Sequence, residues 1–260
     1  MCGRFTLKTP VFDWLVHFLP QYREHWQHAS RALLDTSPRL ALPRWNIAPT
    51  QDVFIVSSGG LGQPPILASA RWGLVPAWSD SLRGGYTMIN ARSETLHEKP
   101  SFKSLLANHR CVLLADGYYE WQQSSVNHRA QAAKTPYWIH PKGELPLAMA
   151  GLWTVNRRAV PGSELRSTTI VTMAADEQTQ SVHDRMPVML PTPEAVQQWL
   201  NLEMPVNALE TFWNPEAGCK VELELRRVSA EVNSVRKDHA ALIHEDVPTS
   251  SSTPGPSEET

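Results

Sequence analysis

The second residue of the chain is the first whose type suggests chemistry. Cys2 follows Met1 directly, and a small second residue generally permits removal of the initiator methionine. A free N-terminal cysteine has an α-amine with a pKa of about 7.7–8.0 and a thiol that titrates near ~8.5. The amine can condense with an aldehyde to an imine, and the thiol can then close a thiazolidine ring. Taken alone, however, Cys2 is better explained as a chance residue of a frayed terminus.

Asn90 and Arg92 form a second candidate pair, within the segment 88–95. In an extended backbone the two side chains point to the same face. The Asn amide offers a donor and an acceptor, and the Arg guanidinium is a planar fork that suits a phosphate. A solvated strand end with an Asn turn explains the same residues equally well.

The segment 111–121 is apolar enough to be buried, yet Asp116 and Glu120 interrupt it. Alternation along an extended chain puts Asp116, Tyr118 and Glu120 on one face. A carboxylate in apolar surroundings tends to have a raised pKa, which suits general acid–base catalysis. The alternative is a half-exposed strand whose acids face water. We favour the functional interpretation here.

His183 and Arg185 lie close together in the segment 181–188. Histidine titrates near neutral pH without any perturbation, and Arg185 is able to hold a phosphate beside it. For an isolated His, a polar loop that ends at Pro187 is the simpler interpretation. Four weak signals are therefore spread over the chain: a terminal thiol, an Asn–Arg pair, buried acids and a histidine.

Composition limits how these residues could be used. The 260-residue chain is 42% hydrophobic with a formal net charge of −2, so it can bury a core but cannot coat nucleic acid by charge alone. Any DNA contact needs a local basic cluster, and one or two of the ten Trp could stack on bases. Trp72 and Trp78 are candidates, although core packing is the ordinary role of each.

The cysteines and the N-terminus limit the compartment. Cys2, Cys111 and Cys219 are odd in number and far apart, which favours neither a disulfide framework nor a zinc site. A reducing compartment fits best. We find neither a signal peptide nor an apolar segment long enough to span a membrane. The sequence predicts a soluble, cytoplasmic protein.

Hydrophobic periodicity and turn residues predict many short strands and few helices. A helix is expected at 11–19, ended by Pro20, and another from an N-cap at Thr192 through Leu200. Strands are expected at 53–56, 66–74, 111–121, 137–139, 147–155, 167–173 and 226–229. The segments 20–44 and 122–135 read as polar connections, and 246–260 as a disordered tail. Without βαβ alternation, this pattern predicts a single α+β domain at 1–245 on a curved, largely antiparallel sheet.

Taken in order, the motifs resemble one family, the SRAP (SOS-response-associated peptidase) proteins, also called abasic-site processing proteins. The similarity extends over nearly everything except the tail, and seven blocks in fixed order make chance implausible. The blocks are Met1-Cys2-Gly3-Arg4-Phe5, Trp45-Asn46-Ile47-Ala48-Pro49, Trp72-Gly73-Leu74-Val75-Pro76-Ala77-Trp78, Ile89-Asn90-Ala91-Arg92-Ser93-Glu94-Thr95, Ala115-Asp116-Gly117-Tyr118-Tyr119-Glu120-Trp121, Val171-Thr172-Met173-Ala174-Ala175-Asp176 and His183-Asp184-Arg185-Met186-Pro187-Val188, with a weaker echo at Val228-Ser229-Ala230-Glu231-Val232-Asn233.

The resemblance implies a specific activity and a role for each motif. Members of the family bind single-stranded DNA and join the mature N-terminal cysteine to the ring-opened aldehyde of an abasic site as a thiazolidine, which shields the lesion. By motif, Cys2 is then the nucleophile, Asn90 positions it and the opened sugar, Glu120 moves protons, and His183 assists ring opening. The implied DNA-binding residues are Arg4, Trp72, Arg92, Lys99, Thr172 and Arg185.

The same resemblance sets further expectations. Weak strand cleavage at the imine (AP lyase activity) is a natural side reaction, and the peptidase name fits exposure of Cys2. A preference for junctions of single- and double-stranded DNA at stalled forks stays open. We expect no cofactor, no metal and no membrane partner, and a monomer that works in the bacterial cytoplasm, on the nucleoid when it is bound to DNA.

Two other readings remain open. Class II glutamine amidotransferases also begin Met-Cys-Gly, and their N-terminal cysteine attacks an amide; the segments 117–121 and 183–187 have no place in that scheme. A plain single-strand-binding module would bind reversibly, with strong salt dependence and indifference to lesions. The net charge of −2 speaks mildly against it. We rank the crosslinking reading ahead of both.

Overall fold

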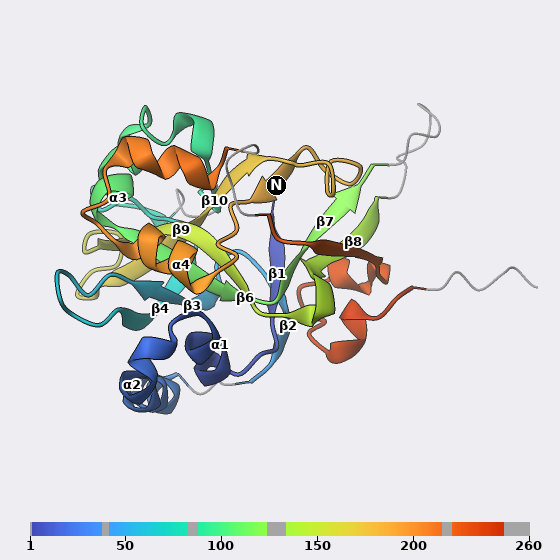
Figure 1. Cartoon of the computed structure of the whole chain (residues 1–260), viewed down its shortest axis with the longest axis horizontal. Coiled ribbons are helices and arrows are strands. Elements are labelled where there is room, and N and C mark those ends of the chain that lie inside the picture. Colours follow the sequence, from blue (N-terminus) through green and yellow to red (C-terminus); the bar gives the residue numbers. More distant parts are fainter. Residues whose placement is uncertain (1, 38–41, 83–87, 124–133, 215–219, 247–260) are drawn as a thin grey trace, which may run out of the picture.

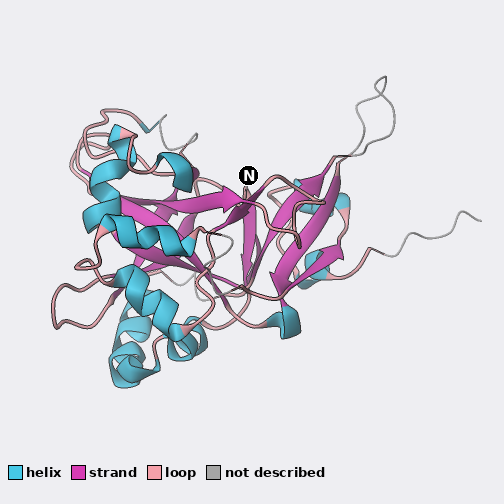
Figure 2. Ribbon diagram, turned by 45° about the horizontal axis from the view of Figure 1, so that its top comes forward, coloured by secondary structure: helices cyan, strands magenta, loops and turns pink. Residues whose placement is uncertain are grey.

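Two β-sheets meet near the start of the chain (Figure 1). The computed structural model describes residues 2–37, 42–82, 88–123, 134–214 and 220–246. The smaller sheet has the order β12-β8-β7-β1-β2 and the larger the order β11-β10-β4-β3-β6-β9, with β5 beside β10. The helices α1 to α4 flank the larger sheet (Figure 2). The fold is therefore α+β, as the sequence predicts.

The elements have the following bounds. The smaller sheet contains β1 (Arg4–Leu7), β2 (Arg44–Ile47), β7 (Gly117–Gln122), β8 (Thr135–Pro141) and β12 (Leu223–Arg227). The larger contains β3 (Asp52–Ser57), β4 (Ile66–Trp72), β5 (Asn90–Arg92), β6 (Arg110–Ala115), β9 (Leu147–Asn156), β10 (Leu165–Ala174) and β11 (Arg185–Pro187). The α-helices are α1 (Val11–Phe18), α2 (Arg23–Thr36), α3 (Pro100–Asn108) and α4 (Pro193–Leu200).

Five strands of the larger sheet form a closed ring of pairings. β10 pairs parallel with β4 on one edge and antiparallel with β9 on the other. The chain of antiparallel pairs β4–β3, β3–β6 and β6–β9 completes the ring. Closure leaves these strands no free edge, and their inward residues form a core rich in Val, Leu and Ile. Rigid strand ends on this ring can position side chains accurately.

Most of the predicted elements are confirmed, within one to a few residues at their ends. The helix α1 ends just before Pro20, and the hydroxyl of Thr192 caps α4 by accepting from the backbone N of Ala195 at 3.2 Å. The segment 20–44 is corrected, because most of it is helical: α2 alone spans fourteen residues. This helix buries only Trp26 and Ser30, so its apolar signal is faint.

The predicted single strand at 111–121 is wrong in one respect. It is two strands, β6 and β7, which belong to different sheets and separate at Asp116. The Asp116 carboxylate accepts hydrogen bonds from the backbone N of Lys8, from the backbone N of Thr9 at 3.0 Å and from its hydroxyl at 2.5 Å. These bonds anchor the corner to the segment that follows β1.

The C-terminal part of the described chain holds the outer side of β1 and β2. The Asn46 amide nitrogen lies within hydrogen-bonding distance of the carbonyls of Val232 (3.2 Å), Ser234 (3.0 Å) and Lys237 (2.8 Å). The Arg4 guanidinium donates to Val232 O at 2.7 Å and to the Asn46 side-chain oxygen at 2.9 Å. The first and last described segments are therefore fastened together. Of the tail predicted at 246–260, the structure describes Asp246 alone, whose backbone N donates to Arg227 O at 3.0 Å, and the rest lies outside the described residues.

Candidate active site

Cys2 lies at the start of β1 and is completely buried. Burial, and then the nearby charge of Glu120, raises the pKa of the Cys2 thiol well above its usual range. Its sulfur lies 3.9 Å from the carbonyl of Arg4, a weak contact. A thiol in these surroundings is neutral, so it needs a neighbouring base before it can act as a nucleophile.

Asn90 holds the main chain of Cys2. The edge strand β5 aligns Asn90 with Ile170 of β10, and the Asn90 amide nitrogen donates to the carbonyl oxygen of Cys2 at 2.9 Å. The amide oxygen of Asn90 is buried and accepts no hydrogen bond from the described residues. The side chain thus fixes Cys2 on one side and keeps an acceptor for a second partner on the other.

Strand pairing brings Glu120 to the same place. β1 and β7 are antiparallel, with Arg4 opposite Tyr119 and Phe5 opposite Tyr118. Continued by one residue, this register places Glu120 opposite Gly3, which lies between Cys2 and the start of β1. Glu120 is only 2% exposed, and its effect on the Cys2 pKa places it within electrostatic range. Of the two acids predicted in this segment, Asp116 fastens a corner and Glu120 lies within electrostatic range of the thiol.

His183 is carried by the loop between β10 and β11. The Asp176 carboxylate braces this loop by accepting from the backbone N of Gln178 (3.0 Å) and of Thr179 (3.2 Å). From the other side, the Gln122 side-chain amide donates to Ser181 O at 2.9 Å. The loop is therefore tied directly to β7, the strand that carries Glu120.

The ring of His183 has two partners for one nitrogen. Its Nδ1 accepts from the backbone N of Arg185 at 3.0 Å and lies 2.8 Å from the carboxylate of Asp184. The hydrogen bond from the Arg185 backbone requires an Nδ1 without a proton, whereas the contact with Asp184 is strongest when Nδ1 is protonated. The neutral ring that accepts from Arg185 carries its proton on Nε2, and the protonated ring keeps it there. Nε2 is then a hydrogen-bond donor in both states.

Glu120 and His183 line one cavity of about 590 Å³. Its other lining residues come from β7 and the residue after it, from the residue before β8 and from the segment that fastens β1: Trp121, Gln123, Lys134, Ala230 and Asn233. The Trp121 indole donates to the Asn233 side-chain oxygen at 2.7 Å. The fold thus joins all four predicted catalytic residues: Asn90 and Glu120 through Cys2, and His183 through the cavity.

Arg185 is already paired in this structure. Its guanidinium donates to both carboxylate oxygens of Glu94, at 2.5 and 3.0 Å, and to Thr172 O at 2.8 Å. The hydrogen bonds from Arg185 lower the pKa of Glu94. Sequence reasoning assigned no role to Glu94, although a carboxylate four positions after Asn90 was the available signal.

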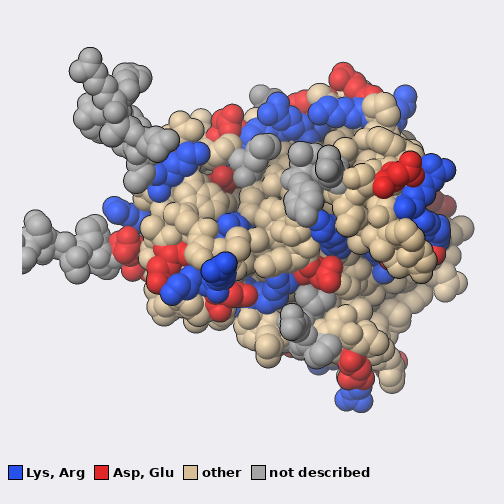
Figure 3. All heavy atoms as spheres, turned by 180° about the vertical axis from the view of Figure 1, so that it is seen from behind, with Lys and Arg blue, Asp and Glu red and all other residues tan. Residues whose placement is uncertain are grey.

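The other predicted DNA-binding residues differ in exposure. Arg92 and Lys99 are exposed, at the end of β5 and at the N-cap of α3; no hydrogen bond or ion pair of the described residues joins Lys99 to the Cys2 cluster. The Thr172 hydroxyl is buried, behind Arg185. Basic side chains also form a run along the upper edge of the face in Figure 3, so positive charge is local although the net charge is −2.

Trp72 does not fit its expected contact with bases. It is 0% exposed, its indole donates to Ile89 O at 3.0 Å, and its ring meets Phe5 edge-on at 5.0 Å. A fully enclosed ring offers no face to a base, so we correct its role to core packing beneath β1. Trp78, six residues later, is 62% exposed and has the surface that Trp72 lacks.

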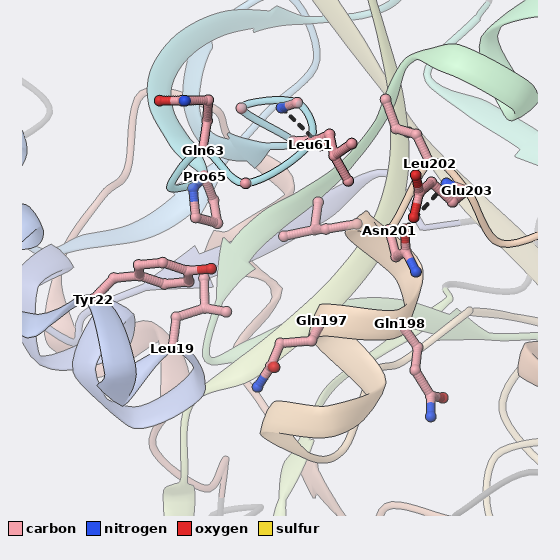
Figure 4. A pocket seen from close by; sticks show the side chains of 15 residues that line it. Leu19, Tyr22, Leu61, Gln63, Pro65, Gln197, Gln198, Asn201, Leu202 and Glu203 are labelled. Atoms are coloured by element: carbon pink, nitrogen blue, oxygen red, sulfur yellow. Dashed lines mark hydrogen bonds between the residues drawn. The ribbon is translucent and has the colours of Figure 1, made fainter.

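A second cavity, of about 530 Å³, lies outside this cluster (Figure 4). Leu19 and Tyr22 form one wall, Gln63 and Pro65 another, and the end of α4 with the residues after it a third. None of the predicted site residues lines it. Within the described residues no group of three His, Cys, Asp or Glu is placed to hold a metal ion, and no helix there is long and apolar enough to cross a membrane.

The chain is similar to several abasic site processing proteins. The chain is 34% identical over 252 residues to the Bacillus subtilis abasic site processing protein YoqW, covering 94% of this chain and 99% of that protein. It is 29% identical over 247 residues to the Escherichia coli abasic site processing protein YedK, with 94% and 99% covered. A chicken (Gallus gallus) relative, HMCES, is 35% identical over 196 residues, with 66% and 55% covered.

Solved structures carry the same fold. A phage-related protein from Bordetella bronchiseptica is 31% identical and superposes with a TM-score of 0.64, covering 87% of this chain and 94% of that one. A Bacteroides thetaiotaomicron protein superposes with a TM-score of 0.73 at 20% identity, with 95% and 100% covered, which supports the fold alone. The family model for SOS response associated peptidase matches residues 1–235. The chain is therefore a member of the SRAP family.

Proposed function

We propose that this chain processes abasic sites in single-stranded DNA by a covalent reaction of Cys2. One observation carries the proposal: a buried cysteine at position 2 has its carbonyl held by Asn90 at 2.9 Å, with a buried carboxylate within electrostatic range. The motif order and the names of relatives such as YoqW support the choice of substrate. The proposal requires removal of Met1, which lies outside the described residues.

The reaction begins when the α-amine of Cys2 attacks the aldehyde carbon of the opened deoxyribose. The carbinolamine loses water to give an imine. The thiol proton then passes to Glu120, the sulfur attacks the imine carbon, and the imine electrons move to nitrogen, which takes up a proton. The product is a thiazolidine, and one water is released for each crosslink. Glu120 supplies the base that the neutral thiol of Cys2 requires.

Two further residues assist this sequence. His183 donates from Nε2 to the ring oxygen of the sugar, which favours the open aldehyde. Asn90 offers its unpaired amide oxygen to the opened sugar while it holds Cys2. β-Elimination from the imine would cut the strand, so weak AP lyase activity accompanies crosslinking. Any peptidase activity is limited in this proposal to exposing Cys2.

DNA binding falls to a local set of side chains. Arg92 and Lys99 are exposed and contact flanking phosphates, and Trp78 stacks on a base. Arg185 reaches a phosphate once Glu94 is displaced, with Thr172 supporting it from behind. Arg4 fastens the protein's own carbonyls and supports the cluster from within.

A denaturing gel tests the proposal. The protein, with Met1 removal proven by mass spectrometry, is incubated with a single-stranded oligonucleotide that has one enzymatically generated abasic site, without borohydride. We expect a shifted band with the abasic oligonucleotide and none with an intact-base control of the same sequence. A processed protein that gives no shifted band contradicts the proposal. Glutaminase activity, or salt-sensitive binding indifferent to the lesion, would then identify one of the two alternative readings.

A further inference from the structure

Tyr118 is buried near the reacting groups, and neither the family motifs nor the proposed mechanism assigns a role to its hydroxyl. It is 0% exposed and precedes Glu120 by two residues in β7, so the two side chains share one face of the strand. Its hydroxyl makes no hydrogen bond of good geometry with the described residues. Buried hydroxyls usually have a partner, so one without a partner needs an explanation.

The surroundings of this phenol identify its neighbours. Burial raises the pKa of Tyr118 well above its usual range, and the charges of Cys2, Glu120 and Asp176 raise it further, while a weak side-chain hydrogen-bonding contact with Thr179 opposes the shift. The phenol therefore stays protonated at any physiological pH. It cannot act as a base, but it can always donate a hydrogen bond.

The adjacent tyrosine shows what a satisfied hydroxyl looks like in the same strand. Tyr119 is equally buried, points to the opposite face and packs in a separate cluster with Trp138. Its hydroxyl donates to Trp45 O at 2.7 Å. The two consecutive tyrosines thus differ in the use of the hydroxyl: that of Tyr119 holds the fold, and that of Tyr118 lies among Cys2, Glu120 and Thr179.

We propose that Tyr118 is a catalytic residue for ring closure that donates a hydrogen bond to the Cys2 sulfur as that sulfur loses its proton. This inference rests on the proposed function. As the S–H proton passes to Glu120, negative charge develops on the buried sulfur. The O–H group of Tyr118 stabilises that charge, and the sulfur then attacks the imine carbon. Tyr118 keeps its own proton throughout, so the balance of the reaction is unchanged.

The hydrogen bond from Tyr118 assists thiol addition to the imine and does not affect the earlier condensation of the amine with the aldehyde. Loss of the hydroxyl should therefore let the imine accumulate while the thiazolidine forms slowly. Borohydride reduces the imine to a stable amine, and β-elimination cuts the strand from the same intermediate. The ratio of borohydride-dependent to borohydride-independent crosslink therefore measures how much of the product is imine and how much is thiazolidine. A general loss of structure would lower the amounts of both crosslinks together.

The test compares Tyr118→Phe with Tyr119→Phe, in single-turnover reactions with the abasic oligonucleotide. We expect Tyr118→Phe to slow the borohydride-independent crosslink by roughly tenfold to a hundredfold, the range for a hydrogen bond to a charged group, and to raise the borohydride-dependent fraction and strand cleavage. Cys2→Ser provides the reference pattern for a pure imine. Tyr119→Phe should keep the wild-type ratio and unfold at a lower temperature, because it loses a bond that the fold uses.

Three outcomes would overturn the inference. One is a wild-type rate and ratio for Tyr118→Phe. Another is an equal fall of both crosslink forms in Tyr118→Phe, together with a lowered unfolding temperature, which would make the hydroxyl structural. The third is the absence of any crosslink with the processed wild-type protein, which would refute the proposed function itself and remove the basis of this inference.

Discussion

Cys2 and Cys111 are both completely buried, and they differ in what surrounds them. Burial raises the pKa of both thiols, that of Cys111 to about 12. Cys111 lies in β6, in the closed ring of strands, and among the described residues its thiol has one hydrogen-bonding partner, the hydroxyl of Thr168 at 3.4 Å. Cys2 has the Asn90 amide on its carbonyl and Glu120 near its thiol.

The comparison separates reactivity from a perturbed pKa. A raised thiol pKa on its own marks an inert, packed cysteine, as at Cys111. Of the two, Cys2 alone combines the shift with a nearby carboxylate, an amide bonded to its carbonyl and a cavity of about 590 Å³ beside that carboxylate. The neighbours distinguish the two sites, and each neighbour can be changed separately.

The largest expected effect comes from replacing each of the two cysteines with alanine. Cys2→Ala should abolish the crosslink, because neither an N-terminal alanine nor any other residue can close the thiazolidine. Cys111→Ala should leave crosslinking at the wild-type rate and lower the free energy of unfolding by about 1–2 kcal/mol through lost packing. Denaturing gels and urea unfolding measure the two effects. A Cys111 variant that fails to crosslink while folded would remove the distinction.

The second effect tests the base. Glu120→Gln keeps the shape of the side chain but removes its ability to accept the thiol proton, so the crosslinking rate should fall by roughly 10²- to 10⁴-fold. The matched control is Asp116→Asn, which disturbs a buried carboxylate used only to accept from Lys8 and Thr9. It should reduce stability with little change in the rate of the folded protein. Equal rates for Glu120→Gln and wild type would show that another group takes the proton.

The third effect tests the polar neighbours of each thiol. Asn90→Ala releases the carbonyl of Cys2, and we expect the crosslinking rate to fall by roughly tenfold to a hundredfold, the equivalent of a strong hydrogen bond at the reacting residue. Thr168→Val removes the polar contact of Cys111 and should leave the rate unchanged. Rates at saturating oligonucleotide separate this effect from weaker DNA binding. The comparison fails if the two variants behave alike.

The smallest effect is a pH dependence of stability. The Cys111 thiol has a pKa of about 12 in the folded protein, against an ordinary value of 9.0. The unfolded chain therefore loses this proton first, and the stability that Cys111 contributes is present below pH 9 and is lost as the pH rises toward 12. From pH 8 to pH 10, wild type should lose about 1.4 kcal/mol more than Cys111→Ala. Urea unfolding at both pH values measures this, and parallel pH curves would contradict it.

The sequence predicts those parts of the fold in which local pattern and final structure agree. The β-branched runs of β3 and β10 and the Thr192 cap of α4 depend on neighbours in the chain, and all three are confirmed. The break between β6 and β7 depends on bonds from Lys8 and Thr9, more than a hundred positions away. No window of the sequence contains that information.

The site follows the same rule. Motif order was enough to name Cys2, Asn90, Glu120 and His183, and the fold brings them together. Their roles, like those of the DNA-binding residues, stay predictions. Residue type alone could not separate Trp72 from Trp78, because enclosure is set by the packing of Phe5 against the ring. Nor could it show that Glu94 pairs with Arg185, which depends on how β5 and β11 flank β10.

The hydrogen bonds from Arg4 to the carbonyls of Val232 and Asn233 also bear on biosynthesis. They join residues that are 228 and 229 positions apart, so this attachment of β1 forms only after the last described segment has left the ribosome. The first strand therefore reaches its final contacts late in synthesis, after every described strand of both sheets has been made.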